Sequence, residues 1–165
     1  MMNDCVMVPI FHLNLVLAVS NAWVVYPMYQ VVVSATLDSA WRYGLISILM
    51  AQSIASATQH ITERHCSPHR MCGTVCANAV EHGMLWADRA MAGLVSVAYI
   101  CLIWSHVGIG IFMGSWYAMY LAWCMGLIYV SDNHIQGSPL LYTMIHLVWH
   151  ISIYSFLGDI IRWID

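Results

Sequence analysis

The sequence predicts an all-α integral membrane protein, a single domain over residues 1–165 built as a bundle of about five transmembrane helices. Of the 165 residues, 61% are hydrophobic and only 8% are charged, whereas a soluble domain carries about 25% charged residues. Apolar runs of about twenty residues, the length that crosses a bilayer, recur along the chain. Twelve methionines, eight tryptophans and nine tyrosines suit a lipid-facing bundle with aromatic interfaces.

The apolar runs give the expected helices in chain order: residues 6–33, 42–61, 85–104, 107–130 and 140–161. Polar segments between them predict the loops, of which residues 62–84 form the longest. Pro27 is expected to kink the first helix, because its ring removes a backbone hydrogen bond. The N-terminus lacks the basic residues of a signal or transit peptide, so we expect the first helix to stay in the protein.

Composition also limits the expected partners. All five basic residues are arginines and the formal net charge is -3, so no basic patch exists to hold nucleic acid. Membrane lipid is the expected partner, with other membrane subunits as an alternative. The sequence does not distinguish an endomembrane from the mitochondrial inner membrane, and the sparse arginines do not fix an orientation.

Cysteines gather in the longest loop. Cys66, Cys72 and Cys76 lie beside His65 and His69. Such a group could bind zinc, but it contains no CxxC pair, so a disulfide or free thiols are the plainer interpretation.

Polar side chains form stripes on two of the expected helices. Residues three and four apart share one face of a helix. The stripe on the second helix is Ser53, Ser56, His60 and Glu63, and the stripe on the last helix is Thr143, His146, His150 and Tyr154. Because ionisable groups in hydrocarbon are costly without partners, we expect both stripes to face inward and to mark a site.

Chain direction predicts that these groups meet at one depth. His60 ends the second helix and Asp88 starts the third, on either side of the 62–84 loop. The third and fourth helices then carry the chain away and back. His146 and His150, near the start of the last helix, are therefore expected at the depth of His60.

Three neutral imidazoles predict a Zn²⁺ site formed by His60, His146 and His150, with a fourth position left open, which is the catalytic pattern. Asp88 is the expected general base for a water molecule. Ser56, one turn from His60, is expected to donate a hydrogen bond to the substrate oxygen as charge develops. These parts together predict zinc-dependent hydrolysis of a lipid amide or ester.

The order Ser56-Ala-Thr-Gln-His60, then Asp88, then His146-Leu-Val-Trp-His150 resembles the CREST superfamily. That group includes alkaline ceramidases, progestin and adipoQ receptors and myomaker-like proteins. The resemblance implies zinc on the three histidines, with Ser56 and Asp88 contacting water or substrate. Members generally have seven helices, so this chain would be a shortened relative.

Other interpretations remain open at the level of sequence. His60 could bond to backbone or headgroups, Asp88 could pair with Arg89 or Arg64, and His146 and His150 could be unrelated core residues. The chain could also be a non-enzymatic accessory subunit of a membrane complex with a vestigial or structural metal site. Two further alternatives are a receptor with the same fold and a haem protein in which histidines from facing helices are the axial ligands.

Overall fold

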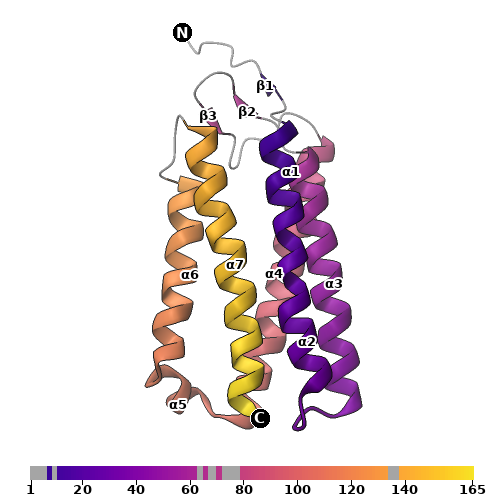
Figure 1. Cartoon of the computed structure of the whole chain (residues 1–165), viewed down its shortest axis with the longest axis vertical. Helices are drawn as coiled ribbons and strands as arrows, with labels where there is room; N and C mark the ends of the chain where they lie inside the picture. Colours follow the sequence, from indigo (N-terminus) through magenta and orange to yellow (C-terminus); the bar gives the residue numbers. More distant parts are fainter. Residues whose placement is uncertain (1–6, 9–10, 63–64, 67–69, 72–78, 134–137) are drawn as a thin grey trace.

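The computed structural model describes residues 7–8, 11–62, 65–66, 70–71, 79–133 and 138–165. In chain order, the helices are α1 (Phe11–Ser20), the 3₁₀ turn η1 (Asn21–Val24), α2 (Val25–Val33), α3 (Ser39–Thr62), α4 (Ala79–His106), α5 (Ile109–Met113), α6 (Trp116–Asn133) and α7 (Pro139–Ile164). The long helices run side by side in one bundle (Figure 1). Short strands β1 (Met7–Val8), β2 (His65–Cys66) and β3 (Arg70–Met71) pair antiparallel at one end of it.

The predicted helical class is confirmed, and the helices fit a membrane protein. Over the described residues, three segments are long and apolar enough to cross a membrane: Phe11–Val33, His82–His106 and Pro139–Ile164. The 24-residue α3 falls outside this group because its Ser, Thr, Gln and His residues lower its mean hydropathy. In α6 the apolar stretch, Trp116–Ser131, is shorter than a span. The finer expectation of about five spanning helices therefore stays a prediction.

The first span changes its helical form just before Pro27. Its α-helix gives way to the 3₁₀ turn η1 at Asn21–Val24 and resumes as α2. Pro27 cannot donate a hydrogen bond to the carbonyl of Trp23, four residues earlier, and its ring crowds that carbonyl. A 3₁₀ turn is thus present upstream of Pro27, and the kink expected at the proline stays a prediction.

The expected single helix over residues 107–130 is wrong, because the structure divides it into α5 and α6. Gly108 ends α4: its φ is +87° and its amide donates to the carbonyl of Ile103 at 2.8 Å. This left-handed conformation favours glycine. At the second break, both the amide and the hydroxyl of Ser115 donate to the carbonyl of Phe112, at 2.9 and 2.7 Å. The hydrogen bonds of Gly108 and Ser115 therefore end helices inside a run of apolar residues that suggested one continuous helix.

The 62–84 segment is more regular than expected. α4 begins at Ala79, six residues before the predicted start, and β2 and β3 lie within the predicted loop. Met7 in β1 pairs with Cys66, and Val8 pairs with His65. Two-residue strands leave almost no periodicity in a sequence, so the alternation that signals longer strands is absent.

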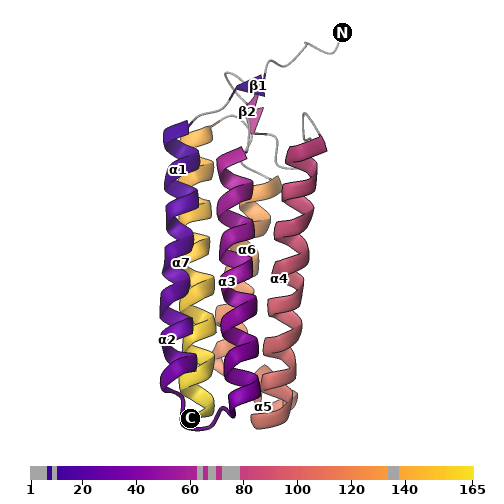
Figure 2. The ribbon, with the colours of Figure 1, turned by 90° about the vertical axis from the view of Figure 1, so that its right-hand side faces the viewer.

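The long helices pack side by side around the interior of the bundle, but not every neighbouring pair is in contact. α3 packs against α4 on one side and α1 on the other, while α7 packs against α6 and against α1 and α2. Figure 2 shows α1, α2 and α7 together, with α3 between them and α4. In the described part of the chain, α4 and α6 make little contact with each other. The backbones of α4 and α6 are therefore not packed against each other.

Candidate metal site

His60, His146 and His150 meet in the interior of the bundle. The ring centroid of His60 lies 4.9 Å from that of His146 and 5.2 Å from that of His150, and the two α7 rings are 4.9 Å apart. One nitrogen from each ring lies within 4.8 Å of the others. All three side chains are buried, at 2%, 6% and 1% exposure. This cluster could hold a metal ion.

Two helix segments position these rings. His60 lies in the last turn of α3, and His146 and His150 lie one turn apart near the start of α7. Ser138 caps α7, accepting a hydrogen bond from the amide of Leu141 at 3.3 Å, and Pro139 occupies the first turn. This cap fixes where α7 begins and hence the depth of its histidines. The predicted convergence at one depth is found.

Ser20 at the end of α1 orients the His150 ring. The Ser20 hydroxyl donates to the carbonyl of Leu17 at 2.6 Å, and its oxygen lies 2.5 Å from His150 Nδ1. Because the hydroxyl hydrogen is already used, Nδ1 is the donor, and Nε2 keeps its lone pair. Nε2 is buried and has no hydrogen-bond partner among the described residues. A neutral imidazole with a free, inward Nε2 suits a metal ligand.

Ser131 on α6 contacts the ring of His146 in a similar way. Its hydroxyl oxygen lies 3.0 Å from His146 Nδ1, and both residues are buried. With Nδ1 engaged, Nε2 is the nitrogen left for an ion. Neither serine was predicted, because each lies on a different helix from the histidine that it contacts. An expectation that metal-bound histidines carry an outer hydrogen bond would have prompted a search for them.

Ser56 and Asp88 lie beside the histidines on α3 and α4. Ser56 is buried one turn before His60. Asp88 is half-buried and accepts a hydrogen bond from Gln52 Nε2 at 3.0 Å. The Asp88 carboxyl group also interacts with the Ser56 and His60 side chains. Gln52 was missed, although it precedes Ser56 by four residues and so continues the polar stripe of α3.

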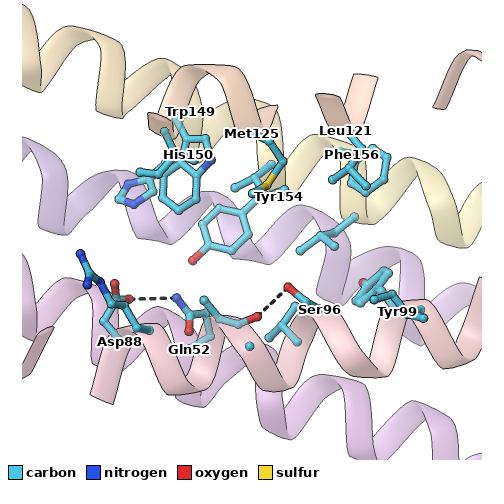
Figure 3. Close-up of a pocket in the computed structure, with 18 of the residues that line it drawn as sticks. Gln52, Asp88, Ser96, Tyr99, Leu121, Met125, Trp149, His150, Tyr154 and Phe156 are labelled. Carbon is cyan, nitrogen blue, oxygen red and sulfur yellow. Dashed lines mark hydrogen bonds between the residues drawn. The ribbon is translucent and has the colours of Figure 1, made fainter. Parts of the chain in front are cut away.

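A cavity of about 590 Å³ opens from this polar group, lined by α3, α4, α5, α6 and α7. Asp88, Gln52, His146 and His150 line its polar part. Figure 3 shows Asp88 and Gln52 across the space from His150 and Trp149. The rest of the wall is largely apolar and includes Val95, Ile103, Ile109, Phe112, Leu121, Phe156 and Leu157. Its volume suits a small lipid or drug-sized molecule.

The ring geometry favours an ion over haem. The His60 ring meets the rings of His146 and His150 edge to face, with interplanar angles of 81° and 68°. Axial ligands of haem lie on opposite sides of the porphyrin plane. Rings in direct contact leave no space for that plane between them.

Some predicted residues fall outside the described part of the chain. Glu63, Arg64, His69, Cys72 and Cys76 lie outside it, as do the side chains of His65 and Cys66, whose backbone forms β2. Neither the second zinc site nor an ion pair between Asp88 and Arg64 is therefore described.

The fold is a helical bundle with three candidate membrane spans and a buried three-histidine cluster. Comparison of the chain with models of protein families, with curated proteins and with solved structures finds no match. The resemblance to the CREST superfamily therefore rests on the residues quoted above and remains a prediction.

Proposed function

We propose that this protein is a zinc-dependent transmembrane hydrolase that cleaves an amide or ester bond in a membrane lipid. The observation that carries the proposal is the three-histidine cluster beside a largely apolar cavity. A buried cluster of nitrogen ligands suits zinc, and the largely apolar cavity lining suits the acyl chain of a lipid. The CREST-like order of Ser56, His60, Asp88, His146 and His150 supports the same activity.

The proposal includes five spanning helices. At about 1.5 Å per residue, α3 extends about 36 Å and α6 about 27 Å, close to the ~30 Å hydrocarbon core. Polar residues of α3 such as Gln52, Ser56 and His60 are buried inside the bundle, which lets a less apolar helix cross. With five spanning helices, the histidines would lie near the membrane face that carries the strands.

His60, His146 and His150 would hold the zinc ion, with Ser20 and Ser131 orienting the two α7 rings. Bound zinc supplies a Lewis acid that polarises the substrate carbonyl and acidifies water. Asp88 takes a proton from the attacking water as the water oxygen bonds to the carbonyl carbon. Ser56 donates to the carbonyl oxygen as negative charge develops. Asp88 then returns the proton to the departing nitrogen or oxygen as the C–N or C–O bond breaks, giving a fatty acid and an amine or alcohol.

The test is hydrolysis of defined lipids by the purified protein in lipid nanodiscs. A long-chain N-acyl amide and the corresponding ester would be supplied, and free fatty acid would be measured by mass spectrometry. We expect fatty acid release that a zinc chelator abolishes and added zinc restores. Lack of release from either lipid by zinc-loaded protein would contradict the hydrolase proposal and favour the accessory-subunit alternative.

A further inference from the structure

The buried residue Asn21 is bonded to three helices of the bundle. It begins the 3₁₀ turn η1 and is 1% exposed. Its Nδ2 donates to the carbonyl of Leu17 in α1 at 3.1 Å, and its Oδ1 accepts from the hydroxyl of Tyr154 in α7 at 2.9 Å. From α3, the Ser53 hydroxyl donates to the Asn21 backbone carbonyl at 3.1 Å. Asn21 therefore ties the end of α1 to α3 and α7.

The residue before Asn21 is Ser20, whose hydroxyl oxygen lies beside His150 Nδ1. Ser20 and Asn21 are anchored at the same place, because both side chains donate to the Leu17 carbonyl, at 2.6 and 3.1 Å. The bonds of Asn21 to α3 and α7 also hold the backbone at this point. The position of the Ser20 hydroxyl, and with it the direction in which His150 Nε2 points, therefore depends on Asn21.

Tyr154 contacts His150 from a second side. It lies one turn after His150 on α7, and the two ring centroids are 6.2 Å apart with their planes tilted by 36°. Figure 3 shows Tyr154 next to His150. The Tyr154 ring is fixed by its hydroxyl, since a rotation of the ring would break the bond to Asn21. Asn21 is thus bonded to Tyr154 and adjacent to Ser20, the two groups that hold the His150 ring.

We propose that Asn21 is a positioning residue of the metal site, which holds Ser20 and Tyr154 so that His150 presents Nε2 to the ion. This rests on the metal site of the proposed function and not on hydrolysis. Hydrogen-bond partners that orient a metal-bound histidine are worth about 10–100-fold in metal affinity. Asn21 is not one of the three ligands, so it acts on the ion through these two neighbours.

Binding of Co²⁺, a spectroscopic substitute for Zn²⁺, tests this role without any substrate. Metal-free, full-length protein in nanodiscs would be titrated with Co²⁺, followed by visible absorption, and then with competing Zn²⁺. Asn21→Leu has a side chain of similar shape that bonds neither Leu17 nor Tyr154. We expect it to bind both ions about 10-fold more weakly, the lower end of the range for outer partners, with a changed Co²⁺ spectrum. Wild-type affinity and spectrum in this variant would overturn the proposal.

Two tyrosine variants separate positioning from general stability. Tyr154→Phe keeps the ring and removes only the bond to Asn21, so it should also weaken Co²⁺ binding. Adding it to Asn21→Leu should weaken binding no further, because both changes break the same bond. Tyr26→Phe is the matched control: it also removes a tyrosine hydrogen bond between the first span and α7, to Asp159 at 2.6 Å. Its Co²⁺ binding should equal that of the wild type.

Equal weakening by Tyr154→Phe and Tyr26→Phe would overturn the proposal, since lost stability alone would then explain both. Should Asn21→Leu fail to fold, the comparison of these two tyrosine variants still decides the question.

The same titrations distinguish this inference from the proposed function. Wild-type protein that binds neither Co²⁺ nor Zn²⁺ would contradict the metal site and with it both proposals. Wild-type binding that Asn21→Leu and Tyr154→Phe leave unchanged would overturn the inference alone. Binding that both variants weaken, in a wild-type protein that releases no fatty acid from either lipid, would sustain the inference and contradict the hydrolase.

Discussion

Asp88→Asn is expected to lower lipid hydrolysis by about 10²–10⁴-fold, the usual contribution of general acid–base catalysis. Asparagine keeps the shape of the side chain but cannot take a proton from water. Asp88 lies beside the histidine cluster without belonging to it, so zinc content should not change. The measurement is the initial rate of fatty acid release, with zinc determined in the same preparation.

The matched control is Asp159→Asn. Asp159 lies on α7 nine residues after His150, where it accepts a hydrogen bond from Tyr26 at 2.6 Å. The same chemical change there should leave the rate per folded protein near that of the wild type. An Asp88→Asn protein that hydrolyses lipid at the wild-type rate would exclude Asp88 as the general base. Zinc loss from that variant would indicate instead that Asp88 is a ligand.

Gly158→Ala is expected to destabilise the fold by about 1–3 kcal/mol, the usual cost of overpacking. A Cβ atom at Gly158 would lie 2.4 Å from Cε1 and 2.6 Å from Cδ1 of the Tyr26 ring. The ring cannot simply move aside, because its hydroxyl is bonded to Asp159. In an ordinary helix interior the same substitution stabilises by about 1 kcal/mol. A loss of stability is therefore diagnostic of this contact between α2 and α7.

Thermal unfolding in detergent, followed by circular dichroism, would measure the effect. Gly126→Ala on α6 is the control, because a Cβ atom there meets nothing within 4 Å. Its melting temperature should stay level or rise. Adding Tyr26→Leu to Gly158→Ala should remove most of the added cost, since the clashing ring is gone. If Gly158→Ala alone melts at or above the wild-type temperature, the close packing of Tyr26 on α7 is wrong.

Helix positions and the meeting of the histidines could be predicted because both depend on patterns of short range. Apolar runs located the ends of the long helices to within six residues, apart from the break between α5 and α6. Spacing of four residues placed His146 and His150 on one face of α7, and alternating helix direction brought His60 to the same depth. These inferences need only the geometry of a helix and the thickness of a bilayer.

The surroundings of the histidines could not be predicted in the same way. Ser20 and His150 are 130 residues apart in the chain, and Ser131 reaches His146 from a different helix. Which side chains touch across helices depends on how each helix is rotated about its axis. The hydrogen bond from Gln52 on α3 to Asp88 on α4 depends on the same rotation. Sequence thus predicted that the three histidines meet, and structure shows which side chains surround them.

Zinc content tests the central claim most directly. The wild-type protein, purified without chelators, and a His146→Ala/His150→Ala variant would be compared by elemental analysis, with circular dichroism to confirm that the variant is helical. We predict about one zinc per chain in the wild-type protein and none in the folded variant. Wild-type protein without zinc that also fails to take up added zinc, or a folded variant that retains it, would contradict a zinc site formed by the three histidines.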